Sequence, residues 1–301
     1  MIALLLGCVL SHHPEERVVA PPASSSSWES VIATPGVVSH AIEVSARTHS
    51  SLSGLLDLSD PRAAGIEDQT VPIVLPVHVL HHPEFGVFVV DTGIDRELAA
   101  GRPGAVRGIP RLALGQIEPV KPLGDILAAA PAALKGVLIT HMHPDHIMGL
   151  MDVEPDVPVY VGAGEQQAKD VRFGLLRRSY RALFSGRAPL QVWDFSTAPV
   201  IDGIAAIDIL GDGSLWALDA HGHTPGSTAY LAITTQGPML MVGDTSHTVW
   251  GWENGVIPGK FTMDPEKNAR SLGALRGLVE RYPEIQVHVG HELERGDWGQ
   301  P

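Results

Sequence analysis

The chain has 301 residues and a formal net charge of −13, from 34 acidic against 21 basic residues. This length suffices for one large domain with its own core, and the excess of acid argues against a nucleic-acid partner bound through its phosphates. The single cysteine, Cys8, excludes an internal disulfide framework and a cysteine-rich zinc module. By contrast, the 15 histidines make clusters of this residue the first place to look for a site.

The N-terminal segment carries a short apolar run that ends at the cysteine. Leu5-Leu6-Gly7-Cys8 resembles the lipobox of bacterial lipoproteins, and a stretch rich in Pro and Ser follows it. We therefore expect residues 1–27 to be a signal and a disordered tether. A lipid on Cys8 would attach the protein to a membrane and place it in the cell envelope. The alternative is a frayed N-terminus on a cytoplasmic protein.

From Trp28 onward short apolar runs alternate with turns, so we expect one domain over residues 28–301. A helix interrupted by Pro131 is expected over 125–134, and a buried strand over 136–140 runs directly into a group of histidines. The other elements expected in the first half are a hairpin of strands 73–80 and 86–90, a strand 157–161 and a helical segment 164–184.

The second half repeats this rhythm. Asp264-Pro265 is a capping residue followed by proline at the first helical position, which predicts a helix over 264–281. Strands are predicted at 214–218, 228–233, 239–242 and 285–289. Because strands precede helices twice along the chain, we predict an α+β fold in four layers, with two packed sheets and helices outside.

The segment His141-Met142-His143-Pro144-Asp145-His146 holds four side chains that can bind metal within six positions. In an extended backbone His141 and His143 point the same way and can hold one ion. Asp145 and His146 follow where the chain turns, and can face a second ion nearby. Nitrogen and oxygen donors favour zinc.

Further metal-binding side chains come directly after later apolar runs. His223 lies in Gly222-His223-Thr224-Pro225-Gly226, Asp244 follows the strand 239–242, and His291 follows the strand 285–289. Strand ends are where ligand sites are usually built. Each residue alone is a weak signal, but together with the first cluster they predict a single metal centre.

In this order the motifs resemble those of the metallo-β-lactamase superfamily, over residues 73–291. The resemblance implies an αββα sandwich with the metal site along one edge and two Zn²⁺ ions, with Fe or Mn as other possibilities. It implies that His141, His143 and His223 hold one metal, that Asp145, His146 and His291 hold the other, and that Asp244 bridges them. His221 is next to the pattern but outside it, so we place it behind the ligands or on the surface.

Asp244 argues against a β-lactamase activity, because the resemblance implies that the β-lactamases of the superfamily carry Cys or Ser at this position. The resemblance implies that a hydroxide bridging the metals attacks the substrate and that Asp145 delivers a proton to the leaving group. The N-acyl homoserine lactonases are the nearest branch in motif, so a small-molecule lactone or ester is the expected substrate. They usually carry Tyr at position 247 and often His at 227, where this chain has His247 and Ser227. His247 is expected to donate a hydrogen bond to a substrate carbonyl.

Several alternatives stay open. A thioesterase of the glyoxalase II type and a phosphodiesterase use similar motifs, and a non-hydrolytic metal-binding or flavodiiron-like redox module is a different class. Arginines over 172–187 suit either an anionic substrate or a solvated helix face. Trp250 and Trp252 suit either an apolar lip over the site or core packing, and residues 101–124 suit either a lid or a plain crossover.

Overall fold

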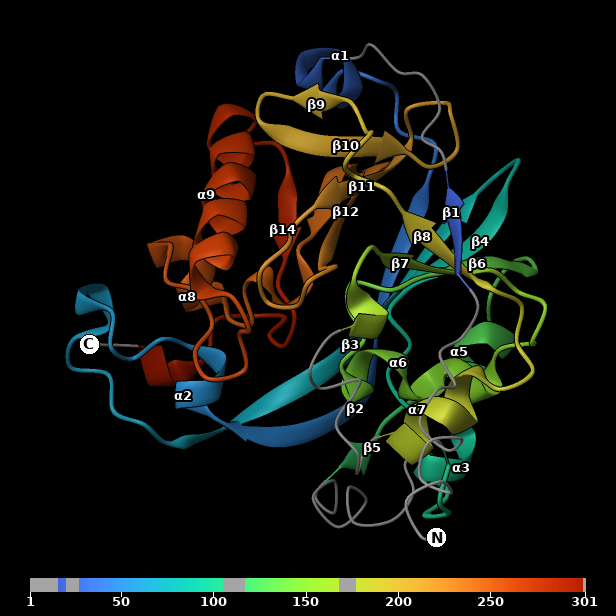
Figure 1. Cartoon of the computed structure of the whole chain (residues 1–301), viewed down its shortest axis with the longest axis horizontal. Helices are drawn as coiled ribbons and strands as arrows, with labels where there is room; N and C mark the ends of the chain where they lie inside the picture. The colour runs from blue at the N-terminus through green and yellow to red at the C-terminus, as the bar shows by residue number, and fades with distance from the viewer. Residues whose placement is uncertain (1–15, 20–26, 105–116, 168–176, 300–301) are drawn as a thin grey trace, which may run out of the picture.

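The computed structural model describes residues 16–19, 27–104, 117–167 and 177–299 (Figure 1). Within these ranges the strands form two sheets. The first sheet has the order β1-β8-β7-β6-β4-β3-β2-β5 and consists of β1 (Glu16–Val19), β2 (Ser39–Ser51), β3 (Thr70–His82), β4 (Gly86–Val90), β5 (Glu118–Pro119), β6 (Leu134–Leu138), β7 (Val159–Gly162) and β8 (Leu190–Trp193).

The second sheet has the order β14-β13-β12-β11-β10-β9. Its neighbours are antiparallel except β13 and β14, which run parallel. Its strands are β9 (Val200–Ile201), β10 (Ile204–Asp208), β11 (Leu215–Asp219), β12 (Thr228–Thr234), β13 (Gly237–Met241) and β14 (Gln286–His288). The helices are α1 (Trp28–Ile32), α2 (Leu52–Leu55), α3 (Arg96–Ala99), α5 (Leu123–Ala128), α6 (Pro144–Ile147), α7 (Arg177–Phe184), α8 (Val249–Asn254) and α9 (Pro265–Arg281).

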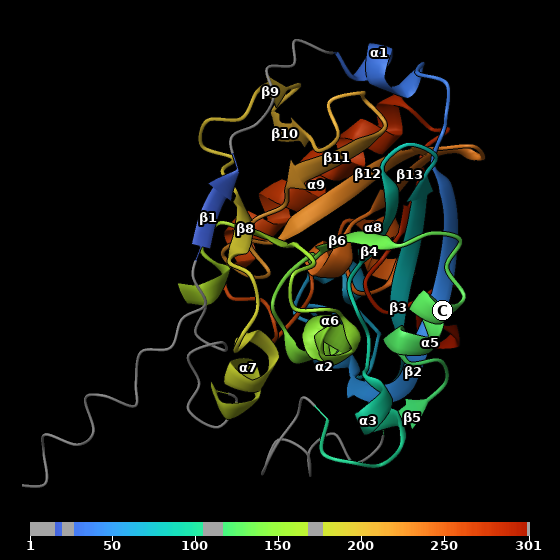
Figure 2. The same cartoon turned by 90° about the vertical axis from the view of Figure 1, so that its right-hand side faces the viewer.

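The two sheets pack face to face, and helices cover both outer faces (Figures 1 and 2). Between the sheets, Phe88 and Leu138 of the first sheet share one core with Tyr230 of the second. On the outer faces, Val137 packs with residues of α7, and Leu231 packs with residues of α9. The predicted αββα sandwich is therefore confirmed.

Strands buried on both faces explain the continuous apolar runs in the sequence. Along β4, Phe88 and Val90 belong to the core between the sheets, whereas Val89 belongs to the core under the helices. Side chains alternate between the faces of a strand, so both sets must be apolar when both faces are covered. The same alternation holds in β12, where Tyr230 and Leu231 lie in different cores.

The expected hairpin is present as β3 and β4, which pair antiparallel, and the expected strands at β6, β7 and β11 to β14 are also present. Helix α9 begins as predicted, because the Asp264 side chain accepts a hydrogen bond from the Lys267 amide at 3.0 Å. The helix expected over 125–134 is shorter than predicted: α5 ends at Ala128, before Pro131, and Leu134 already belongs to β6. Of the segment 164–184, only Glu165–Gln167 and α7 are helical among the described residues.

Strand β2 was not predicted. It pairs with β3 over nearly its whole length, and a register shift between Val44 and Ala46 bends it. Most of its residues are polar or half-buried. The sequence of β2 therefore lacks the clear alternation of apolar and polar residues that indicates a strand. The tertiary pairing with an apolar neighbour forms this strand, not its own composition.

The predicted tether differs from the structure at Glu16–Val19, which form β1 and pair parallel with Leu190–Trp193. This strand is held by main-chain pairing at the sheet edge, since Val18 is 64% exposed and buries little side chain. Cys8 and most of the remaining tether lie outside the described residues, as does much of the segment 101–124, for which a lid and a plain crossover were both open. No helix in the described ranges has the length and apolar character needed to cross a membrane.

Candidate metal centre

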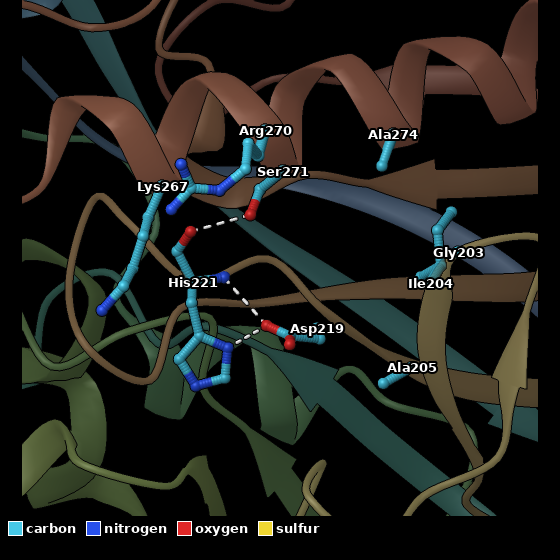
Figure 3. Close-up of a pocket in the computed structure, with 9 residues that line it drawn as sticks. All are labelled: Gly203, Ile204, Ala205, Asp219, His221, Lys267, Arg270, Ser271 and Ala274. Carbon is cyan, nitrogen blue, oxygen red and sulfur yellow. Dashed lines mark hydrogen bonds and ion pairs between the residues drawn. The ribbon is translucent and has the colours of Figure 1, made fainter.

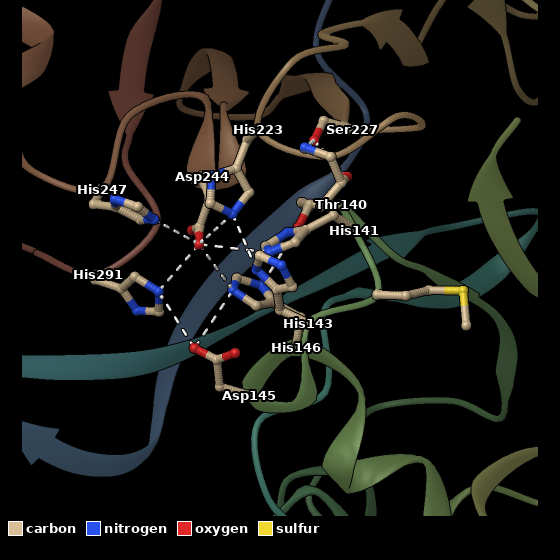
Figure 4. A network of polar contacts seen from close by, with 12 residues as sticks. Thr140, His141, His143, Asp145, His146, His223, Ser227, Asp244, His247 and His291 are labelled. Carbon is tan, nitrogen blue, oxygen red and sulfur yellow. Dashed lines mark hydrogen bonds and ion pairs between the residues drawn. The ribbon is translucent and has the colours of Figure 1, made fainter. Parts of the chain in front are cut away.

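Loops that follow strands of both sheets converge on one point at the edge of the sandwich (Figure 4). His141 and His143 follow β6, and His143 is the residue before α6, which carries Asp145 and His146. His223 lies between β11 and β12, Asp244 directly follows β13 in a short 3-10 helix, and His291 follows β14. The structure thus brings together all seven residues that the sequence analysis predicted as ligands.

The Asp244 carboxylate lies at the middle of this cluster and is buried. Its Oδ2 atom is within 3.5 Å of the Nε2 atoms of five histidines, namely His141 (3.5 Å), His146 (3.5 Å), His223 (3.4 Å), His247 (2.9 Å) and His291 (3.3 Å). Burial alone would raise the pKa of Asp244, but the surrounding imidazoles outweigh it and hold the pKa well below its usual range. The carboxylate is therefore ionised and able to bind cations.

The donor atoms fall into groups of the size that a metal ion requires. His141, His143, His223 and Asp244 form one group and Asp145, His146 and His291 a second, with ligand atoms within 4.8 Å of one another in each. His143 Nδ1 and His223 Nε2 are 3.0 Å apart. Asp244 also belongs to a third group with His291, so it is placed to be shared between two ions.

Three buried donor atoms in the cluster have no hydrogen-bond partner among the described residues: His141 Nε2, His146 Nε2 and Asp244 Oδ1. Leaving such atoms unpaired costs about 1–3 kcal/mol each, and buried charges are retained where they are paired or bind metal. The unpaired atoms and the nitrogen and oxygen donor set therefore fit a pair of divalent cations.

The pKa values of His146 and His291, the two histidines of the second group, are set by the carboxylates around them. Burial lowers the pKa of His146, but Asp91, Asp244 and Asp145 outweigh burial and raise it well above the usual value. The pKa of His291 rises to about 9 for the same reason, mainly through Asp244. In the first group burial dominates and the pKa values of His141 and His223 are lowered, so these rings are neutral.

Asp91 supports the centre and was not predicted as a site residue. Its Oδ2 atom is 2.7 Å from His146 Nδ1 and 2.8 Å from the Thr140 hydroxyl, and its Oδ1 accepts from the Thr140 amide at 2.8 Å. A carboxylate behind a metal-binding histidine sets the orientation of the ring and increases its basicity. The available signal was the position of Asp91 directly after the buried strand β4.

Glu165 is a second supporting carboxylate that the sequence analysis missed. It is buried, and it accepts hydrogen bonds from the amides of Met142 at 2.6 Å and Gly226 at 2.7 Å. Burial raises the pKa of Glu165, while these donors favour the ionised form. Glu165 thereby links the loop of His141 and His143 to the turn after His223. No spacing in the sequence marks it, because it lies in a different segment from both.

Gly290 is required by the close packing of two of these loops. A Cβ atom at this position would lie 2.1 Å from Asp244 Oδ1, so any larger residue would displace the carboxylate. Gly290 also donates its amide to the Ser246 carbonyl at 3.0 Å. The glycine before His291 thus allows two ligand loops to approach each other.

A cavity of about 330 Å³ opens above the donor atoms. Its floor includes His143, Asp145 and Asp244. Its walls come from α2, β2, β3 and two loops. Leu55, Ile73, Leu75, Ile117 and Phe261 form an apolar part, and β2 contributes the polar residues Thr48, His49 and Ser50. Phe261 is 47% exposed at the rim. The centre is therefore open to a small molecule with an apolar part.

The tryptophan pair does not form a lip over this cavity. Trp250 is buried in a cluster with Leu52 and Leu56, and Trp252 packs against the core under α9. Both lie in α8, and neither lines the cavity. Of the two readings of the sequence, core packing is correct, because the helical turn directs these rings away from the metal centre.

His221 lies away from the centre, in a separate surface pocket of about 370 Å³ (Figure 3). Its backbone amide and its Nδ1 atom both contact Asp219, and its carbonyl accepts from the Ser271 hydroxyl at 2.7 Å. Lys267 and Arg270 of α9 line the same pocket. The expectation that His221 lies at the surface or behind the ligands is met by the surface position, not by a contact with a ligand.

A two-sheet sandwich with a histidine and aspartate centre for two cations at its edge defines a class of metal-dependent hydrolase. Residues 77–291 match the family model described as "Metallo-beta-lactamase superfamily". The chain is 30% identical over 233 residues to the N-acyl homoserine lactonase AttM of Azorhizobium caulinodans. The aligned region covers 75% of this chain and 83% of that protein. The chain therefore belongs to the metallo-β-lactamase superfamily.

Solved structures show the same fold. A mutant of B. thuringiensis AiiA with N-decanoyl-L-homoserine bound at the active site superposes with a TM-score of 0.64 at 19% identity, covering 86% of this chain and 94% of that one. AidC, a dizinc quorum-quenching lactonase, gives a TM-score of 0.55 at 16% identity, with coverage of 86% and 88%. The fold and the motifs together identify a metal-dependent hydrolase.

Proposed function

We propose that the protein opens the ring of an N-acyl homoserine lactone-like substrate with two zinc ions. The observation that carries the proposal is the cavity itself, which joins a floor of metal donors to a wall with an apolar part. A lactone with an acyl chain has the same two parts: a polar ester to be cleaved and an apolar tail. The names of AttM, AiiA and AidC point to this substrate class, and the dizinc relative supports zinc.

When bound, the two ions lower the pKa of water to supply a nucleophile near neutral pH and polarise the substrate carbonyl. The chain's own residues contribute charge and proton transfer. Asp145 reaches the cavity, and its side chain is 30% exposed, whereas Asp244 is 3% exposed. We assign Asp145 the transfer of a proton to the leaving alkoxide, because it alone of these two carboxylates is open to a substrate.

The apolar wall sets the preference for the acyl part. Phe261 lies at the rim and Leu55 and Ile73 lie deeper, so a longer chain buries more apolar surface along this wall. Each buried methylene contributes about 0.8 kcal/mol. Lactones with medium acyl chains should therefore have a lower KM than the same lactone with a short one, and Phe261→Ala should reduce that difference.

The test is a panel of N-acyl homoserine lactones, a glutathione thioester and a phosphodiester, assayed with the zinc-loaded protein. The expected result is the highest kcat/KM for a lactone, with a dependence on chain length that Phe261→Ala weakens. Phe85, which is 38% exposed, does not line the cavity, so Phe85→Ala is a matched control. A higher kcat/KM for the thioester or the phosphodiester would replace the lactone proposal with that alternative. Iron content with oxygen consumption would favour the redox class.

We also propose a cell-envelope location through a lipid on Cys8. The support is the sequence Leu5-Leu6-Gly7-Cys8 alone. Expression in a bacterial host with radiolabelled palmitate tests it, with Cys8→Ser as the matched variant. Label that is retained in Cys8→Ser, or absent from the wild type, would contradict the lipid attachment.

A further inference from the structure

His247 lies in the floor of the cavity but is not one of the seven residues that the resemblance assigns to metal. Its side chain is 1% exposed, and its Nε2 atom is 2.9 Å from Asp244 Oδ2. The other four imidazoles around that oxygen are 3.3–3.5 Å from it. His247 is therefore nearer to the shared carboxylate than these four assigned histidines.

The hydrogen bond at the outer edge of the His247 ring fixes the direction in which Nε2 points. Nδ1 of His247 is 3.0 Å from the Leu55 carbonyl oxygen. A carbonyl oxygen only accepts hydrogen bonds, so Nδ1 carries the proton. Nε2 is thereby turned toward the centre, where it contacts Asp244 Oδ2 at 2.9 Å. A ring held by a backbone carbonyl through Nδ1, with Nε2 facing a group of donor atoms, has the orientation of a metal-binding histidine.

His291, an assigned ligand, has the same arrangement. Its Nδ1 atom is 3.0 Å from the Val74 carbonyl oxygen, and its Nε2 atom points to Asp244 Oδ2. The rings of His247 and His291 are stacked, with centroids 5.4 Å apart and planes at 28°, and the His291 amide donates to the His247 carbonyl at 3.0 Å. Asp244, His247 and His291 have ligand atoms within 4.8 Å of one another. Figure 4 shows both rings on the same side of Asp244.

We propose that His247 is an additional metal ligand, and that its Nε2 atom binds the ion held by Asp145, His146 and His291. The second position would then have four side chains of its own besides the shared Asp244. The inference rests on the two-cation centre of the proposed function and is independent of the lactone substrate. It implies that the protein binds the second ion more strongly than Asp145, His146, His291 and the shared Asp244 would by themselves.

The test is the metal affinity of His247→Asn. The asparagine amide can still donate to the Leu55 carbonyl but has no atom in the place of Nε2. Metal-free protein is titrated with Co²⁺, followed by visible absorption, and with Zn²⁺ against a chelator. We expect two ions in the wild type, and in the variant an unchanged first ion with a second ion weakened more than about 100-fold. A residue that only orients a ligand costs about 10–100-fold.

His49→Asn is the matched control, because His49 lines the same cavity but is exposed and belongs to none of the metal groups. It should leave both affinities unchanged. A loss below about 100-fold in His247→Asn, or a Co²⁺ spectrum of the second ion identical to the wild type, would overturn the ligand. If circular dichroism shows that His247→Asn does not fold, X-ray absorption and a crystal structure of the zinc-loaded wild type decide. An Nε2 to zinc distance of about 2.0–2.1 Å supports the ligand, and a separation above about 3 Å removes it.

The outcomes separate the two proposals. A wild type that binds only one ion would overturn the dinuclear centre and this ligand together. A wild type that binds two ions but cleaves no lactone would remove only the substrate. A variant that loses the second ion while the wild type prefers another substrate would still establish His247 as a ligand.

Discussion

Among the described residues two clusters of histidines occur, and they differ in the charges around them. The second cluster consists of His40 in β2, His78 in β3 and His288 in β14, with ring centroids 5.2–5.7 Å apart. His40 Nε2 and His78 Nδ1 are 3.0 Å apart, the same distance as between His143 and His223 in the metal centre. Close imidazoles alone therefore do not distinguish the two sites.

Carboxylates make the difference. In the second cluster burial lowers the pKa of all three histidines, to about 4 for His40, and no carboxylate raises any of them. In the metal centre Asp244 lies among the rings and raises the pKa values of His146 and His291. Among the described residues, every group of three or more close donor atoms lies in the metal centre. A buried carboxylate turns a neutral histidine cluster into a cation site.

The largest expected effect comes from removing that carboxylate. Asp244→Ala should bind fewer than two metal ions and lose at least about 100-fold in kcat/KM, since bound metal contributes several kcal/mol to the reaction. Metal analysis and kinetics on the purified variant measure both. Asp219→Ala removes a carboxylate beside a histidine outside the centre and should change neither. Full activity and metal content in Asp244→Ala would mean that the site is elsewhere.

A smaller effect is expected from a carboxylate that acts through a ligand. Asp91→Asn keeps the size of the side chain but weakens the contact with His146 Nδ1, so metal affinity should fall about 10–100-fold. Chelator competition measures the change. Asp212→Asn is the matched control, because Asp212 contacts His82 at 2.9 Å away from the centre. An equal loss in both variants would show a general effect on folding instead of on the metals.

The second cluster should contribute to acid stability in the metal-free protein. The pKa of His40 is about 4 in the folded chain, against an ordinary value of 6.5 in the unfolded chain, so the unfolded chain binds protons first as pH falls. The contribution of His40 to stability should be complete above pH 6.5 and decline toward pH 4. Urea unfolding at several pH values measures it. His40→Asn should flatten this decline, whereas His49→Asn should not; equal profiles would exclude His40 as the cause.

The smallest effect is expected at His221, a histidine that lies outside both clusters. His221→Ala should leave metal content and kcat/KM within about twofold of the wild type, because a surface substitution changes free energies by about 0.5 kcal/mol or less. Its pocket is similar in volume to the cavity above the metal-donor residues, about 370 against 330 Å³. A marked loss of hydrolysis in this variant would show that volume, and not unpaired buried donors, marks the functional pocket.

The sequence predicted much of the fold because its apolar runs and turns are local signals. The runs at β4, β6 and β12 are buried on both faces, and α9 carries its own capping residue. Strand β2 could not be predicted, since its polar composition becomes a strand only through pairing with β3. The same holds for β1, which pairs at the edge through its main chain.

The sequence by itself determined the seven predicted donors, because each follows an apolar strand in a compact motif. Only the tertiary structure decided what surrounds them. Asp91 and Glu165 lie 55 and 23 residues from the groups they contact, and no local spacing records such contacts. The orientation of His247 was decided in the same way, by the carbonyl of Leu55, 192 residues away in the chain. Motifs specify which donors are present, whereas long-range packing sets their charge, orientation and protons.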